Sequence, residues 1–348
     1  MADHIERKFT KKHQEVSYFL NYDVQLEYLC DHGLLIDDVS SAKSILATAS
    51  FHNLENYDDL LLDEYGNYSK GMTLNDLYNL YLLDKSVQNV LFQYSTHIET
   101  IFKTALGYNI AKNISEEDFY YLSENAYKNG KQYVRKLNRT LKALRATRDK
   151  SIDNPTLYYR QNCEFIPPWI LFVNVTFSTC IDLSDLLWAQ DRQELIDSIL
   201  AVSIPEDSRS DYVKDSLNTI RKFRNAIAHN LEFISMRIPK QQKINFRRAK
   251  PAFLGTMLHD EDQGIRCDGD PFSMIIAIIS LIKEPNLVSK FFYDLGLQLR
   301  HFSDEKIFSK YCVATGLPVD ILKRGNKFCE AIRGIGNTQI SMDDYYNL

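Results

Sequence analysis

The feature that most constrains this chain is the run from Leu74 to Ala111, which contains no proline and one glycine. Thr73 stands directly before the run and can cap its first turn. Apolar residues recur in the run at spacings of three, four and seven residues, at Leu77, Leu80, Val87, Leu91, Ile98, Ile101 and Ala105. Such spacing is typical of an amphipathic α-helix with one buried face. We therefore predict one long helix, against whose apolar face other elements pack.

The rest of the chain also favours helices. Only 13 glycines and 9 prolines interrupt its 348 residues, and stretches with the alternating pattern of a strand are few and short. Residues 20–50 predict two short helices, the first ended by Gly33 and the second opened by Ser40. We predict an all-α fold with three segments, which are an N-terminal helical region at 1–71, a helical core at 72–235, and a basic loop with a C-terminal helical region at 236–348.

Two apolar stretches raise the question of a membrane span. "FIPPWILFVNVTFSTCI" contains two prolines and an asparagine, and "FSMIIAIISLI" has 11 residues where about 20 are needed. We expect both stretches to be buried helices and expect no contact with a membrane. The charged start, "MADHIERKFTKKH", differs from a signal peptide, so the reducing cytoplasm is the expected location.

The sequence predicts neither a metal site nor a cofactor. The six cysteines are scattered without a Cys-x-x-Cys pair, which argues against a structural zinc site and a disulfide framework. "LHDEDQG" at 258–264 contains a His-Asp pair, but no second His or Asp cluster completes a metal site. "RGIGNT" at 333–338 lacks the preceding strand of a dinucleotide-binding motif.

Positive charge is concentrated in residues 128–150, which hold nine Lys or Arg and one acidic residue. The segment therefore carries +8, whereas the whole chain carries −5 and the remainder −13. It predicts an amphipathic helix whose cationic face consists of Lys128, Lys131, Arg135, Arg139, Lys142 and Arg145. A solvated helix face is one interpretation, but such faces usually mix charges to form i,i+4 pairs. This nearly pure cationic face favours a polyanionic partner, such as a nucleic acid. The basic loop supplies further candidate RNA-binding residues, Lys240, Lys243, Arg247 and Arg248.

The segment "RKFRNAIAHN", residues 221–230, places an arginine, an asparagine and a histidine on one predicted helix. Asn225 and His229 are four residues apart and share a face, whereas Arg224 and His229 lie about 140° apart on an ideal helix. One helix therefore does not easily direct Arg224 and His229 at the same atom. Two copies facing each other across a two-fold axis could do so, and so could a local distortion of the helix.

These three side chains suit the chemistry of phosphate. A guanidinium offers permanently charged donors to a phosphate and to the extra charge of its transition state. An imidazole titrates near neutral pH and can take or give a proton. Together they can promote attack of an RNA 2′-hydroxyl on the adjacent phosphate without a metal ion. The alternative interpretation is that His229 is a partly buried helix histidine with a satisfied hydrogen bond.

"RNAIAH" resembles the Arg-x4-6-His motif of HEPN-domain ribonucleases, in which Asn often follows the Arg. The similarity extends to "YDVQLEYLCDHGLLIDD", "MTLNDLYNLYLLDKSVQNVLFQYSTHIETIFKTAL", "PPWILFVNVTFSTC" and "IRKFRNAIAHN". These stretches occur in the order seen in Abi-type abortive-infection proteins of the AbiD and AbiF group, and they span residues 20–235. The resemblance implies a HEPN-like helical bundle with additional N- and C-terminal helices, and a role in phage defence.

The resemblance also implies roles for individual residues. Arg224, Asn225 and His229 would form the catalytic set of a metal-independent endoribonuclease, with Glu99 or Asp84 of the long helix in support. Two chains of a homodimer would share the site, and a small noncoding RNA would control its activity. The alternative function is that of a non-catalytic protein with the HEPN fold, which binds RNA or acts as a scaffold.

Overall fold

The computed structural model describes residues 19–239, 243–259, 267, 269–302 and 304–333, with the backbone alone at 246–248. Within these ranges the regular elements are helices, and β-pairing is limited to isolated bridges such as that between Leu35 and Thr73. The predicted all-α class is therefore confirmed. The HEPN-like topology stays a prediction.

The chain forms two compact units, Met1–Lys85 and Ser86–Leu348, and their boundary falls inside helix α6 (Leu74–Asn113). Most of the segment predicted as the core, at 72–235, and all of the C-terminal region, at 236–348, belong to the second unit. In the described part of the first unit, the helices before α6 are α2 (Tyr22–Asp31), α3 (Val39–Ala49), α4 (Phe51–Glu55) and α5 (Asp58–Leu61).

In the first unit, local capping explains where α2 ends and where α3 begins. Gly33 follows α2 with φ of 89°, a backbone conformation that suits glycine, as predicted. Asp38 rather than Ser40 opens α3, because its carboxylate accepts a hydrogen bond from the Ser41 N–H at 2.6 Å. Aspartate and serine are equally good caps, so the sequence alone did not distinguish the two positions.

Helix α6 begins where the sequence predicts. The hydroxyl of Thr73 accepts from the Asp76 N–H at 3.2 Å, and the Asp76 carboxylate accepts from the Thr73 N–H at 2.9 Å, a reciprocal cap. The apolar stripe is buried from Leu77 to Ile98, but Ile101 and Ala105 are only half-buried, because Phe102 and Leu106 face the core in their place. A strict seven-residue repeat rotates slowly around a helix of 3.6 residues per turn, which explains this drift.

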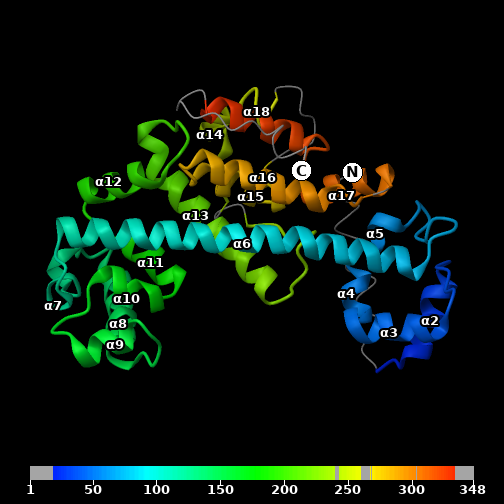
Figure 1. The fold of residues 1–348 in the computed structure, drawn as a ribbon, viewed down its shortest axis with the longest axis horizontal. Helices are drawn as coiled ribbons and strands as arrows, with labels where there is room; N and C mark the ends of the chain where they lie inside the picture. The colour runs from blue at the N-terminus through cyan, green and yellow to red at the C-terminus, as the bar shows by residue number, and fades with distance from the viewer. Residues whose placement is uncertain (1–18, 240–242, 260–266, 268, 303, 334–348) are drawn as a thin grey trace. The chain divides into compact units, whose positions relative to one another are not determined.

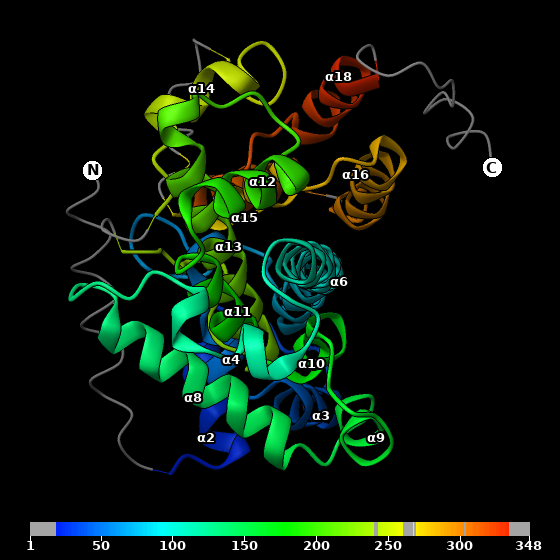
Figure 2. The same cartoon turned by 90° about the vertical axis from the view of Figure 1, so that its left-hand side faces the viewer.

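The second unit continues from α6 through a series of mostly short helices. Figure 1 shows α8 to α11 on one side of α6 and α15, α16 and α18 on the other, and the turned view in Figure 2 agrees. Helix α13 packs against α11, α12 and α15. The elements are α7 (Asp118–Tyr121), η1 (Glu124–Ala126), α8 (Val134–Lys150), α9 (Thr156–Asn162), α10 (Pro168–Asn174), α11 (Phe177–Ser184), α12 (Ala189–Ile199), α13 (Glu206–Ala228), α14 (Phe246–Phe253), α15 (Pro271–Ser280), α16 (Pro285–Leu299), α17 (Glu305–Thr315) and α18 (Ile321–Arg333).

The two apolar stretches differ in outcome. "FSMIIAIISLI" forms α15, whose ten residues are all buried, as predicted. The other stretch is divided into α10 and α11, and the side-chain oxygen of Thr176 caps α11. Helix α10 is not buried on all sides, since Trp169 is 45% and Val173 55% exposed. No helix in the described part of the chain is long and apolar enough to cross a membrane.

The basic helix is shorter than predicted. Helix α8 starts at Val134, and the residues before it are irregular at 128–130 and form a turn at 131–133. Gly130 lies directly before this turn, and its carbonyl oxygen accepts from the Tyr133 N–H at 2.8 Å. The Asn129-Gly130 pair favours a turn over a helix, which explains the difference.

Candidate functional site

Helix α13 carries the segment "RKFRNAIAHN" to its end. Leu217, Ile220 and Phe223 are buried and hold the helix on the core. The helix stops at Ala228, so His229 occupies the capping position, where its N–H still donates to the Asn225 carbonyl oxygen at 3.0 Å. The next residue, Asn230, has φ of 54° and turns the chain away from the helix axis. The histidine thus lies at an irregular helix end, and not within a straight helix.

Arg224 is fixed on three sides. Its guanidinium forms an ion pair with Glu99 of α6 at 3.4 Å and donates to the Asn225 side-chain oxygen at 3.2 Å. It also lies over the ring of Phe92, 5.8 Å from the ring centre. The Nε atom is buried without a hydrogen-bond partner, although the side chain as a whole is 34% exposed. The arginine is therefore held in one orientation and still reaches solvent.

Glu99 lies between two cations. Its carboxylate is 2.8 Å from Lys103, one turn along α6, and 3.4 Å from Arg224. The carboxylate is 16% exposed. One negative and two positive charges leave this group with a net charge of +1, which can attract a phosphate. Lys103 was not among the predicted site residues, although its i,i+4 spacing from Glu99 is visible in the sequence.

His229 stands apart from this group. It is exposed, and within the described residues its imidazole makes no hydrogen bond, ion pair or ring contact, with Arg224 or with any other residue. The interpretation of His229 as a partly buried histidine with a satisfied hydrogen bond is therefore wrong. One chain brings Arg224, Asn225 and Glu99 together and leaves the imidazole of His229 free at the end of α13.

Asp84, the other suggested supporting residue, belongs to the first unit. It is fully buried, and its carboxylate accepts a hydrogen bond from the Tyr57 hydroxyl at 2.6 Å. This contact gives Asp84 a place in the core of its own unit, whereas Glu99 contacts the arginine.

Part of the cationic face of α8 is neutralised by another helix. Lys136 pairs with Asp182 at 3.0 Å and with Asp185 at 2.5 Å, and Arg139 pairs with Asp182 at 2.7 Å. Both aspartates come from the end of α11. Arg145 donates to the Leu122 carbonyl oxygen at 2.7 Å. As predicted, α8 itself carries few acidic residues that could pair with its cations. The aspartates of α11 supply such partners instead.

The remaining predicted cations of this region differ in exposure. Lys131, Arg135 and Lys142 are exposed, and no contact of their side chains is recorded among the described residues. Lys128 is half-buried, with its ammonium 5.8 Å from the centre of the Tyr133 ring. Burial lowers the pKa of Lys128, and the nearby charge of Arg192 lowers it further. The exposed cations remain available to a polyanion.

The basic loop is described only in part. Lys240 and the side chains of Arg247 and Arg248 lie outside the described residues, and Lys243 is half-buried. The loop's predicted contact with RNA stays a prediction. In the described part of the chain, no group of three or more His, Cys, Asp or Glu residues could hold a metal ion.

Comparison with known proteins identifies a family. The family model described as "Abi-like protein" matches residues 44–235, more than half of the chain, and so includes all of α6, α8 and α13. No curated protein and no solved structure matches the chain.

Proposed function

Because the chain belongs to the family of Abi-like proteins, we propose that it is a metal-independent endoribonuclease of an abortive-infection system. Family membership supports a role in abortive infection, a defence against phage. The observation that carries the nuclease proposal is the end of α13. There, a solvent-accessible guanidinium held by Glu99 is followed, one and a half turns later, by an exposed imidazole that has no partner among the described residues.

The chemistry assigns one step to each group. Arg224 would bind the scissile phosphate through the N–H groups that Glu99 and Asn225 do not occupy, and would stabilise its transition-state charge. His229 would take the proton of the 2′-hydroxyl or give a proton to the departing 5′-oxygen. The 2′-oxygen forms a bond to phosphorus and the 5′-oxygen leaves, so the products are a 2′,3′-cyclic phosphate and a 5′-hydroxyl. Glu99 and Asn225 would act as positioning residues.

The free imidazole supports a site completed by a second copy of the chain. Among the described residues of one chain, Arg224 contacts Glu99, Asn225 and Phe92 but not His229. In a homodimer with a HEPN-like core, the ends of two α13 helices would face each other, so that each chain supplies a guanidinium and an imidazole to one cleft. Such a protein would act in the cytoplasm, where its RNA is found, with a small noncoding RNA as its regulator.

The test is cleavage of total RNA by purified protein stripped of nucleic acid, in excess EDTA. We expect cleavage by the wild type and a loss of at least about a hundredfold with Arg224→Ala or His229→Ala. His301→Ala is the matched control, because His301 is also exposed and lies outside the proposed site. The new ends should be 2′,3′-cyclic phosphates, and DNA should stay intact. Equal cleavage by His229→Ala and the wild type, or a requirement for added metal, would refute the mechanism.

A second candidate function rests on the ion pair between Arg224 and Glu99, since a purely structural arginine would also form it. In that case the protein is a non-catalytic RNA-binding or scaffolding module. It would then bind RNA without cutting it, and His229→Ala would leave the affinity unchanged. In either case we expect RNA to copurify with the protein, and sequencing that RNA would identify the regulator or target.

A further inference from the structure

The carboxylate of Asp185 at the end of α11 meets cations from three other helices. It lies 2.5 Å from Lys136 of α8, 2.9 Å from Arg192 of α12 and 2.9 Å from Lys214 of α13, and it is only 9% exposed. Burial raises the pKa of Asp185, but Lys136 and Lys214 lower it by more, so the pKa lies below its ordinary value. The carboxylate is therefore ionised at neutral pH.

Positive charge remains in excess around this carboxylate. Asp182 pairs with Lys136 and with Arg139, and Asp215 lies near enough to Lys214 and Asp185 for their charges to change its pKa, so three carboxylates face four cations. Lys128 is near enough for the charge of Arg192 to lower its pKa. Partly desolvated cations without a matching number of anions are costly to hold together. Such a cluster is stabilised by an additional anion.

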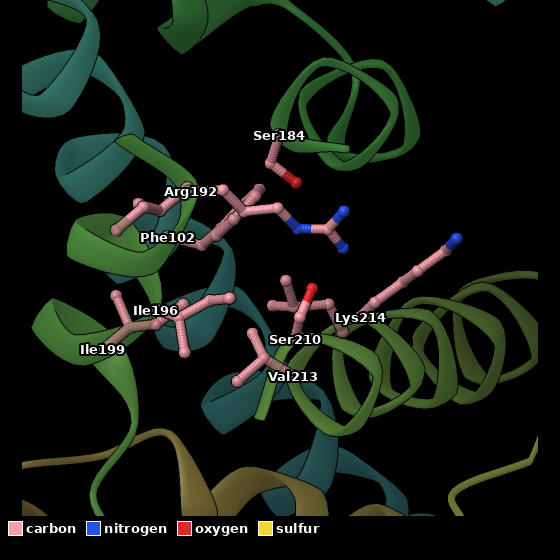
Figure 3. A pocket seen from close by; sticks show the side chains of 10 residues that line it. Phe102, Ser184, Arg192, Ile196, Ile199, Ser210, Val213 and Lys214 are labelled. Carbon is pink, nitrogen blue, oxygen red and sulfur yellow. The ribbon is translucent and has the colours of Figure 1, made fainter. Parts of the chain in front are cut away.

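Arg192 and Lys214 also line a pocket. The pocket is also lined by apolar residues, among them Phe102, Leu195 and Leu217. Figure 3 shows the guanidinium of Arg192 reaching between the α11 end at Ser184 and the side chain of Lys214. One terminal nitrogen of Arg192 contacts Asp185, and no other contact of this guanidinium is recorded among the described residues. Its remaining donors form the planar fork that binds phosphate oxygens.

A polar stripe on α13 leads from this pocket to the proposed site. Lys214, Asn218, Arg221 and Asn225 follow one another at steps of four, three and four residues, so they share one side of the helix, and all are half-buried. Asn218 donates to the Lys214 carbonyl oxygen at 3.0 Å, and Arg221 donates to the Asn218 side-chain oxygen at 3.3 Å. The Nε atom of Arg221 is buried without a partner. The stripe ends beside Arg224.

We propose that Arg192 and Lys214 bind a backbone phosphate of the RNA and that the polar stripe of α13 leads the RNA from there to Arg224. The inference rests on the proposed function and names a contact away from the scissile phosphate. Lys214 and Arg224 are ten residues apart, about 15 Å along the helix. At about 3.4 Å per stacked nucleotide, the two phosphates are roughly four to five nucleotides apart.

The test measures binding apart from cleavage. The full-length chain is titrated with a fluorescent single-stranded oligonucleotide of about 12 nucleotides, within the usual range of single-strand binding sites. The oligonucleotide is 2′-O-methylated, so it has no 2′-hydroxyl and cannot be cut. We expect Arg192→Gln and Lys214→Gln each to weaken binding about three- to tenfold, and each to reduce the slope of log affinity against log salt by about 0.7. Lys323→Gln, which removes an exposed charge from α18, should change neither quantity.

A companion variant separates binding from a structural role. If Arg192 and Lys214 serve only Asp185, then Asp185→Asn should lower the melting temperature without changing the affinity for the oligonucleotide. If they bind phosphate, the same variant frees two cations and should strengthen binding. Unchanged affinity in all three variants, or no binding by the wild type, would overturn the inference.

Two further outcomes distinguish sources of the phosphate and separate this inference from the nuclease proposal. A mononucleotide that binds as tightly as the oligonucleotide, and loses affinity with the same substitutions, would show a site for free nucleotides and overturn the proposed RNA path. Cleavage of total RNA that depends on His229, together with wild-type affinity in Lys214→Gln and Arg192→Gln, would preserve the nuclease and refute the path.

Discussion

Asp215, in the middle of α13, offers a quantitative test of the electrostatics around the proposed RNA path. It is half-buried and forms no ion pair or hydrogen bond recorded among the described residues. Burial raises its pKa, the charge of Asp211 one turn earlier raises it further, and Lys214 opposes the rise only in part. The resulting pKa is about 6. We therefore expect Asp215→Asn to stabilise the protein at neutral pH.

The size and sign of the effect follow from proton linkage. A rise from 3.8 to about 6 corresponds to at most about 3 kcal/mol, at about 1.4 kcal/mol per pKa unit. Because the carboxylate is partly solvated and therefore screened, we expect about 1–2 kcal/mol. The raised pKa means that the folded state holds the proton more tightly. The stability that protonated Asp215 contributes is fully present below the pKa of this carboxyl in the unfolded state. It is lost as the pH rises through the folded-state pKa of about 6.

The assay is urea unfolding of the wild type and Asp215→Asn across the range from about pH 4 to pH 7.5. The two proteins should unfold alike near the acidic end, and the variant should be more stable by about 1–2 kcal/mol at the neutral end. Asp211→Asn is the control, since it removes the same charge from an exposed position of the same helix and should stabilise less. Equal stability at neutral pH, or a difference that persists near pH 4, would refute the argument.

Three other perturbations test the packing. Phe223→Ala, at a fully buried position of α13, should lower the free energy of unfolding by about 3–5 kcal/mol in urea titrations. Gly107→Ala should cost about 1–3 kcal/mol, because the added Cβ would lie 3.0 Å from the Trp169 Cα, a backbone atom that can move only with α10. Iodoacetamide should modify exposed Cys163 in the folded protein but Cys180 only after unfolding, as detected by peptide mass spectrometry. Burial raises the pKa of Cys180 to about 12, which suppresses the reactive thiolate.

Matched variants show whether these effects arise from the stated contacts. Phe119→Ala removes a ring that is 57% exposed and should cost little. Gly130→Ala would place its Cβ 3.3 Å from the flexible end of the Gln132 side chain, which can move aside. If Gly107→Ala and Gly130→Ala were equally stable, α10 would tolerate displacement from α6. Alkylation of Cys180 as fast as Cys163 would contradict its burial.

The sequence predicts elements well where one local rule decides them. Thr73 and Asp76 form the cap that starts α6, and the uninterrupted apolar character of α15 predicts its burial on all sides. Errors occur where two local rules compete. The helical periodicity of the basic segment extends to residue 128, but the turn preference of Gly130 delays the start of α8 to Val134. The spacing of apolar and charged residues shows the helical period. It does not show whether a turn-forming residue within the segment is strong enough to end the helix.

The site was predictable up to the point where different helices meet. The motif gave Arg224 and Asn225, and the family resemblance suggested Glu99, which does contact the arginine. The pairing of Lys136 with Asp185 joins residues 49 positions apart, and such pairing depends on how α8 packs on α11. Periodicity shows which face of a helix is charged, but it does not show which other helix packs against that face. The ion pairs of Arg192 and Lys214 with Asp185 could not be predicted for the same reason.

The complete burial of α15 has a consequence for how this protein is dissected. The Tyr212 hydroxyl of α13 and the Ser280 hydroxyl at the end of α15 are buried and 2.7 Å apart, and the two helices pack along each other. A fragment ending at residue 235 would keep the whole family match and the motif but expose the side of α13 that α15 covers. Loss of function on C-terminal truncation would therefore report a collapsed scaffold, and only point substitutions can assign a role in RNA binding to that region.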